Sequence, residues 1–301
     1  ILHSHMFHAN MVARATRSVT PVDGLISTAH NVYESPPDES VDEEITWRER
    51  AYQMTDSLAD RTTNVADVGI DRYVDLGLVP ESKAKRVYNG LDIDEFRSDD
   101  DAAAQIRDEH GVKDEFVWLA VGRFYPQKDY STMLAAMETS TDLGTLWIVG
   151  HGEQEAELKQ EARERGIDNR VQFLGTVPSV QGYMSAADGY LLSSKWEGLP
   201  MVLIEAMACG LPIVATRAGG SVEAVVDGET GYLVPSTAPV ELADAMQRLH
   251  DLEPDQRQRL GEAGRERAER LFDIRSVTDE WESVYQSVCD GTPSRTADWR
   301  I

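Results

Sequence analysis

The sequence is poor in cysteine and in long apolar runs. Its two cysteines, Cys209 and Cys289, lie far apart among 301 residues and form no metal or redox spacing, which is typical of a protein kept in a reducing compartment. The sequence has no run of about 18 apolar residues, which a membrane span would require. It also lacks the charged segment, apolar segment and cleavage site of a secretion signal. We therefore expect a soluble, cytoplasmic protein, and peripheral contact with the inner face of a membrane stays open.

Positive charge is also scarce. Lysine and arginine together number 29 against 53 acidic residues, which gives a formal net charge of −24. Such a chain would repel a phosphate backbone, so nucleic acid is excluded as a partner. The acidic residues are spread along the chain, as in halophilic proteins whose surface repulsion is screened by salt. An acidic protein without salt adaptation is the alternative.

Residues 115 to 215 alternate between short apolar runs and segments with helical spacing. The predicted strands are 116–121, 146–149, 171–174, 189–192 and 212–215, and the predicted helices between them are 130–139, 153–165, 179–186 and 202–209. Continuous apolar runs of this length are typical of strands buried on both faces. The alternation predicts an α/β architecture with a parallel sheet between helices.

The flanking regions are less regular. We predict a strand end at 1–5, helices over 9–18 and 46–63, strands over 25–30, 67–70 and 85–88, a linker over 92–112, helices over 239–249, 255–272 and 274–288, and a frayed tail from Asp290. Because the chain opens inside a predicted strand, we expect the first of its two domains to be incomplete.

A first charged loop follows the apolar run 116–121. Gly122 admits close backbone approach, and Arg123 and Lys128 place two cations in one loop. Ligands of open α/β sheets bind beyond the carboxyl ends of the strands, where this loop lies. An arginine fork and a compact ammonium suit a diphosphate and would offset the charge that builds on a departing phosphate. Two unrelated surface cations are the alternative.

A second polar loop follows the fourth apolar run and leads into a helix. Pro200 suits a first helical turn, where the free N–H groups of Met201 and Val202 would face an anion. Glu197 precedes the helix, within reach of whatever the phosphate carries. Glu205 lies inside the helix and can accept two hydrogen bonds from a vicinal diol such as that of ribose. For Glu205 alone, a solvated helix carboxylate is the alternative.

Four blocks of the sequence, in order and spacing, resemble glycosyltransferase family 4, the glycosyl transferases of group 1. The blocks are Val121-Gly122-Arg123 with Lys128, Val149-Gly150-His151-Gly152, Phe173-Leu174-Gly175, and Glu197-Gly198 with Pro200 and the run from Glu205 to Ala215. The resemblance extends through Asn89-Gly90-Leu91-Asp92, Gly219-Gly220 with Glu223, residues 227–234 and His3 to Asn10, and so covers nearly all of residues 1–288.

The resemblance implies a GT-B fold. That fold has two Rossmann-like domains with parallel sheets, the first of which is incomplete here, an active site in the cleft, and a C-terminal helix that returns toward the first domain. It implies an acceptor-side domain over 1–90, a nucleotide-sugar-binding domain over 91–275, and a C-terminal helix and tail over 276–301.

The resemblance also implies residue roles. Glu205 would bind the ribose hydroxyls, Glu197 the donor sugar, and the two cations of the first loop the diphosphate. The full donor set is Gly122, Arg123, Lys128, Leu174, Glu197, Gly198, Met201, Val202 and Glu205, with Leu174 bordering the base. The catalytic set is Arg123, Lys128, Glu197 and a histidine of the N-terminal domain, for which His5 is the first choice and His3 the second.

The implied reaction is retaining transfer from a nucleotide sugar, UDP-linked in preference to GDP-linked, to a glycan, lipid or small-molecule acceptor. No cofactor or metal is expected. The Asp-x-Asp spacing of Asp92-Ile93-Asp94 falls at the domain junction, and Gly150-His151-Gly152 lacks the third glycine of a dinucleotide site, since position 155 is glutamate.

Two other functions stay open. Because the family's N-terminal domain normally begins earlier, the chain could bind nucleotide sugars without transferring them. A GT-B epimerase acting on a nucleotide sugar is the second alternative.

Overall fold

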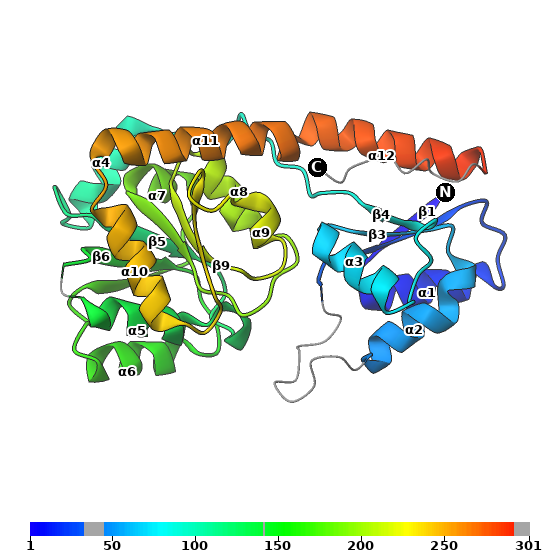
Figure 1. The fold of residues 1–301 in the computed structure, drawn as a ribbon, viewed down its shortest axis with the longest axis horizontal. Helices are drawn as coiled ribbons and strands as arrows, with labels where there is room; N and C mark the ends of the chain where they lie inside the picture. Colours follow the sequence, from blue (N-terminus) through cyan, green and yellow to red (C-terminus); the bar gives the residue numbers. More distant parts are fainter. Residues whose placement is uncertain (33–44, 141, 292–301) are drawn as a thin grey trace. The chain divides into compact units, whose positions relative to one another are not determined.

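The computed structural model describes residues 1–32, 45–140 and 142–291, and these form two compact units. Unit 1 comprises Ile1–Gly90 together with helix α12(Ile274–Cys289), and unit 2 comprises Leu91–Asp273 (Figure 1). Each unit is built on one parallel sheet, as the sequence predicts. The predicted frayed tail lies outside the described residues from position 292 on.

Unit 1 contains a four-stranded sheet in the order β1-β2-β3-β4. Its elements are β1(Leu2–His5), α1(Phe7–Arg17), β2(Leu25–Ala29), α2(Trp47–Thr55), the 3-10 turn η1(Asp56–Leu58), β3(Arg61–Asn64), α3(Asp67–Asp75) and β4(Ala84–Arg86). Phe7, Tyr52 and Tyr73 share one buried cluster with Ala29 of β2. On the other face Ile26 packs with Val277 and Val284 of α12, so the two faces of β2 pack against different helices.

The predicted helix over 46–63 is wrong in its second half. The helix begins after Thr46, whose side chain and Glu49 form a reciprocal capping box, and it ends at Thr55. The chain then forms β3, whose sequence Arg-Thr-Thr-Asn is fully buried although it is polar. Thr62 accepts a hydrogen bond from Arg14, and Thr63 pairs with Thr28. Internal hydrogen bonds thus replace the apolar pattern by which strands are recognised.

Two further predictions are wrong. Residues 67–70, predicted as a strand, form the first turn of α3, in which the N–H groups of Gly69 and Ile70 both donate to the carbonyl of Ala66. The predicted linker over 92–112 contains the helix α4(Asp100–Glu109), which Asp99 caps by accepting a hydrogen bond from the N–H of Ala102.

Unit 2 contains a six-stranded parallel sheet in the order β10-β9-β8-β5-β6-β7. After α4, its elements are β5(Val117–Val121), the 3-10 turn η2(Pro126–Lys128), α5(Tyr130–Thr139), β6(Thr145–Val149), α6(Glu155–Glu164), β7(Val171–Gly175), α7(Gln181–Ala186), β8(Gly189–Leu192), α8(Met201–Ala208), β9(Ile213–Thr216), α9(Ser221–Ala224), β10(Gly231–Val234), α10(Pro239–His250) and α11(Pro254–Phe272). The helices and strands predicted between β5 and β9 lie within a few residues of their observed positions, whereas α9 and β10 were not predicted.

The topology of unit 2 defines where a ligand can bind. From β5 the chain adds β6 and β7 on one side, then returns to place β8, β9 and β10 on the other side. Strand order therefore reverses between β5 and β8, and this switch point is where open α/β sheets bind their ligands. Helices α5, α6 and α10 pack as one group, whereas α4, α7, α8 and α11 pack as another (Figure 1).

Candidate functional site

The two charged loops that the sequence singles out follow the two strands at the switch point. β5 ends at Val121 and β8 ends at Leu192, and the two strands pair directly. The N–H of Lys195 donates to the carbonyl of Gln127 at 2.8 Å. The Ser193 hydroxyl lies 2.8 Å from the carbonyl oxygen of Lys128. These bonds tie the loops together at the carboxyl edge of the sheet.

Lys128 and Glu197 form an ion pair between these loops. The Lys128 Nζ donates to Glu197 Oε1 at 2.6 Å, and only 17% and 8% of the two side chains are exposed. The Ser194 hydroxyl donates to the same oxygen at 2.6 Å. Gln127 Nε2 lies 3.4 Å from the other oxygen, Oε2. Pairing and hydrogen bonding compensate the cost of burying both charges.

Glycines let three loops approach the ion pair closely. A Cβ on Gly219, where φ is 50°, would lie 2.0 Å from the carbonyl oxygen of Glu197. A Cβ on Gly150, where φ is 143°, would lie 1.9 Å from the carbonyl oxygen of Gly122. The N–H of Gly220 also donates to the carbonyl of Gly198 at 2.6 Å. Any side chain at 150 or 219 would force these backbones apart.

The amino end of α8 lies immediately after the Glu197 loop. Pro200 is the residue that precedes the first helical turn, and its carbonyl accepts from the N–H of Leu203 at 3.0 Å. The amides of Met201 and Val202 come too early in the helix to have a carbonyl partner within it. They are available to an anion, as helix amino ends generally are.

Glu205 lies one turn into α8 and is half-buried. Within the described residues its side chain makes no hydrogen bond or ion pair, and burial raises the pKa of its carboxyl. A half-buried carboxylate without a protein partner can accept hydrogen bonds from a ligand. Glu205 thus differs from Glu197, whose Oε1 is already engaged by Lys128 and Ser194.

The remaining predicted donor residues occupy the same edge of the sheet. Arg123 is exposed, with its guanidinium 5.0 Å from the ring centroid of Tyr125. Leu174 lies in β7, half-buried. The structure records no contact that joins Arg123, Leu174 and Glu205 to one another among the described residues.

His5 lies in unit 1, at the carboxyl end of β1. Its Nδ1 is 3.0 Å from Nε2 of His30, and burial lowers the pKa of both imidazoles. His3 points elsewhere: its Nε2 lies 2.6 Å from the Thr28 hydroxyl, its Nδ1 lies 2.9 Å from the Tyr285 hydroxyl, and burial, with His5 and His30, lowers its pKa to about 4. Of the two predicted histidines, His5 is the exposed one.

Two side chains that contact Glu197, those of Ser194 and Gln127, were not among the predicted site residues. Ser194 had a signal in the sequence, because it is a hydroxyl residue three positions before a carboxylate and two positions after the end of a buried strand. Gln127 had no such signal in the sequence, because its contacts with Trp196 and Glu197 arise only when the two loops pack together.

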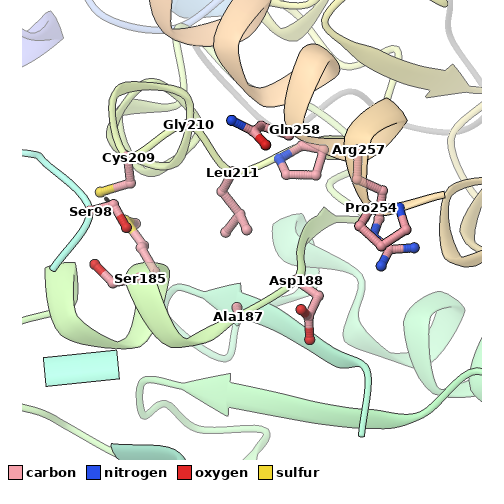
Figure 2. A pocket seen from close by; sticks show the side chains of 12 residues that line it. Ser98, Ser185, Ala187, Asp188, Cys209, Gly210, Leu211, Pro254, Arg257 and Gln258 are labelled. Carbon is pink, nitrogen blue, oxygen red and sulfur yellow. Dashed lines mark hydrogen bonds between the residues drawn. The ribbon is translucent and has the colours of Figure 1, made fainter. Parts of the chain in front are cut away.

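A pocket at the opposite edge of the sheet is a weaker candidate. It lies where β8 and β9 begin and is lined by residues that include Asp188, Cys209 and Arg257 (Figure 2). Asp188 already accepts hydrogen bonds from the N–H of Val117 at 2.8 Å and from Arg107 at 3.2 Å. Arg257 donates to the carbonyl of His250 at 3.1 Å. These charged groups are engaged within the protein.

Residues 1–32, 45–140 and 142–291 contain neither a membrane-spanning helix nor a cluster of metal ligands. None of their helices combines the length and apolarity that crossing a membrane requires. No three of their histidine, cysteine, aspartate or glutamate side chains are grouped so as to hold a metal ion.

Relatives of known structure confirm the fold. Sucrose-phosphate synthase of Thermosynechococcus elongatus superposes with a TM-score of 0.84 at 26% identity, over 96% of this chain and 74% of that one. Anabaena HepE, solved in complex with UDP-glucose, superposes with a TM-score of 0.83 at 24% identity, over 95% of this chain and 78% of that one. The two Rossmann-like regions with parallel sheets are those of a GT-B glycosyltransferase.

Sequence relatives identify the family. D-inositol 3-phosphate glycosyltransferase of Kribbella flavida is 30% identical over 291 residues, which cover 89% of this chain and 67% of that protein. N-acetyl-alpha-D-glucosaminyl L-malate synthase of Bacillus anthracis is 31% identical over 214 residues, 69% of this chain and 55% of that protein. The chain spans about half the length of several curated relatives. Residues 102–267 match the family model of the glycosyl transferases group 1, and the chain therefore belongs to this family.

Proposed function

We propose that this protein transfers a sugar from a nucleotide sugar to an acceptor, with retention of anomeric configuration and without a metal ion. The observation that carries the proposal is the pairing of Lys128 with Glu197 at the switch point of unit 2, just before α8. One turn into α8 lies Glu205, whose carboxylate has no hydrogen bond or ion pair among the described residues. Cation, sugar-binding acid and diol-binding acid thus follow each other along one edge of the sheet.

The diphosphate of the donor is held by positive charge. Arg123 supplies a fork of N–H donors, Lys128 an ammonium, and the first turn of α8 its free amides. All three are sites where charge on a departing phosphate would be stabilised, which is the role a divalent cation takes in metal-dependent transferases. Metal-independent transfer is favoured by this placement of cations.

The sugar and the nucleoside are held by the two carboxylates and their surroundings. Glu205 accepts hydrogen bonds from the ribose diol, Glu197 accepts from a donor-sugar hydroxyl, and Leu174 borders the base. Gly122 and Gly198 leave room for the phosphates beside these side chains. His5 of unit 1 is the proposed catalytic histidine.

The transfer step needs no protein base. The bond between the anomeric carbon and the diphosphate breaks as the acceptor oxygen bonds to the same face of that carbon. The acceptor proton passes to an oxygen of the leaving phosphate, so charge and atoms balance. The lysine and arginine stabilise the transition state by offsetting the leaving charge.

A UDP-sugar is the favoured donor. HepE, which shares the fold, was solved with UDP-glucose. A Mycolicibacterium smegmatis relative, 30% identical over 198 residues, is named as GDP-mannose-dependent, so GDP-sugars form the second arm of the test. The acceptor is a glycan, a lipid or a small molecule, and contact with a membrane would accompany a lipid acceptor.

The test is a panel of UDP- and GDP-sugars examined by thermal melting and by release of nucleotide, with and without EDTA. We expect one donor to raise the melting temperature and to be consumed with EDTA present. Arg123→Ala should weaken both effects, whereas the matched control Arg163→Ala, on the exposed face of α6, should not. Absence of any shift with any nucleotide sugar would refute the proposal. Binding without turnover would indicate a binding module, and interconversion of sugars an epimerase.

A further inference from the structure

The two carboxylate oxygens of Glu197 are in unequal environments. Oε1 accepts hydrogen bonds from the Lys128 ammonium and the Ser194 hydroxyl, each at 2.6 Å. Among the described residues, Oε2 has one hydrogen-bonding neighbour, Gln127 Nε2, at 3.4 Å, which is beyond the usual range of an N–H···O bond. Oε1 is therefore saturated, and Oε2 retains acceptor capacity.

Ser194 is itself held in place. It is fully buried, and its carbonyl accepts a hydrogen bond from the Thr216 hydroxyl at 2.6 Å. The Ser236 hydroxyl lies 3.3 Å from the same carbonyl. Thr216 is the last residue of β9 and Ser236 follows β10, so these strands fix the backbone that carries the Ser194 hydroxyl.

Lys128 alone cannot hold the Glu197 carboxylate in one orientation. Its side chain is long and has several rotatable bonds, and its ammonium has three N–H donors that a bound diphosphate would share. When phosphate oxygens compete for Lys128, the bond from Ser194 remains on Glu197 Oε1. A short hydroxyl on a fixed backbone thus sets the carboxylate plane independently of the donor.

We infer that Ser194 is a positioning residue that holds Glu197 with Oε2 directed at a hydroxyl of the donor sugar. This inference rests on the proposed function, because it assigns the sugar contact to one oxygen of Glu197. It predicts that loss of the Ser194 hydroxyl weakens the interaction with the donor sugar and leaves the affinity for the nucleotide unchanged.

The experiment compares wild type with Ser194→Ala, using UDP alone and the nucleotide sugar that gives the largest melting shift. UDP affinity should stay within about twofold, while kcat/KM should fall by about 10- to 100-fold, the effect of losing one hydrogen bond to a charged group. The loss should lie mainly in kcat, because a misdirected carboxylate is felt most in the transition state. In a Glu197→Ala background, Ser194→Ala should add nothing, since the hydroxyl acts through that carboxylate.

The matched control is Ser131→Ala. Ser131 also donates to a glutamate, Glu161, at 2.7 Å, but on the exposed surface of α5, and its loss should leave every parameter unchanged. Unchanged kcat/KM in Ser194→Ala, or a parallel loss of UDP affinity, would overturn the inference.

A structural measurement separates this inference from the proposed function. In a crystal structure of unliganded Ser194→Ala, the Glu197 carboxylate should rotate or occupy more than one position. A single carboxylate position identical to wild type would overturn the positioning role, whether or not the wild-type protein binds a nucleotide sugar. Failure of the wild type to bind any donor would instead refute the proposed function.

Discussion

Replacing Glu205 by glutamine should weaken donor binding without weakening the unliganded fold. The wild-type carboxyl is half-buried, makes no hydrogen bond or ion pair within the described chain, and has a pKa raised by burial. Its ionised form is therefore unfavourable in the folded protein. The contribution of Glu205 to the free energy of unfolding is greatest below its ordinary pKa of 4.5. This contribution is lost as the pH rises through the higher pKa that the carboxyl has in the folded protein. At pH 7, Glu205→Gln should leave the free energy of unfolding equal to or above that of wild type.

The liganded protein should show the opposite effect. A carboxylate that accepts both hydroxyls of a diol contributes about 1.5 to 3 kcal/mol, which corresponds to about 10- to 150-fold in Kd. Donor at 100 times the wild-type Kd adds about 2.7 kcal/mol of stability, and the same concentration would add only about 0.3 to 1.4 kcal/mol to the variant. For a unit the size of unit 2, the wild-type gain is about 5 to 11 °C of melting temperature.

The assay is thermal melting of both proteins at pH 5 to 8, with and without UDP. Donor affinity of the wild type should rise with pH through the raised pKa of Glu205, and that rise should be absent from the glutamine variant. An undiminished UDP shift in the variant would refute the assignment of Glu205 to the ribose. A large loss of stability in the unliganded variant would show that the carboxylate has a structural role instead.

Three further substitutions test the packing around the site and in unit 1. Lys128→Met leaves the buried Glu197 without its ion-pair partner and should lower the free energy of unfolding by about 3 to 5 kcal/mol in urea denaturation. Adding Glu197→Gln should recover most of this loss. An unchanged free energy of unfolding in Lys128→Met would contradict the pairing. Gly150→Ala places a Cβ 1.9 Å from the Gly122 carbonyl and should cost about 4 kcal/mol or more, so a small loss would mean that the loops are looser than described. Burial lowers the pKa of His3 from 6.5 to about 4. The contribution of neutral His3 to the free energy of unfolding is therefore complete above pH 6.5 and is lost as the pH falls toward 4. In His3→Gln, the free energy of unfolding from urea denaturation should fall less steeply as the pH is lowered.

The sheet of unit 2 could be predicted from the sequence because its strands are apolar throughout. All five residues of β5 are buried and hydrophobic, and α5 begins and ends where helical spacing places it. β3 could not be predicted, because its buried threonines are satisfied by side chains such as Arg14 that arrive from another element. Hydrogen-bonded polar cores leave no periodic signal in the sequence.

The site was predictable to the level of loops and no further. The order of strands brings the loops after β5 and β8 together, so Lys128 and Glu197 could be expected at one edge. Which oxygen of Glu197 is occupied depends on the contacts of Gln127 and Ser194, and these depend on how the loops pack. Chemistry at the level of single atoms is a property of tertiary structure.

The discontinuity of unit 1 has a consequence for synthesis. Helix α12 follows the whole of unit 2 in the sequence, yet Val277 and Val284 complete the cluster that contains Ile26 of β2. At the usual rate of about 5 to 20 residues per second, a ribosome needs roughly 10 to 40 s to extend from Gly90 to Cys289. During that time the face of the unit 1 sheet that carries Ile26 lacks the residues of α12, while unit 2, being continuous, can complete its fold. Unit 1 is therefore begun before unit 2 and completed after it, and the nascent chain must keep that apolar face from aggregating until α12 leaves the ribosome.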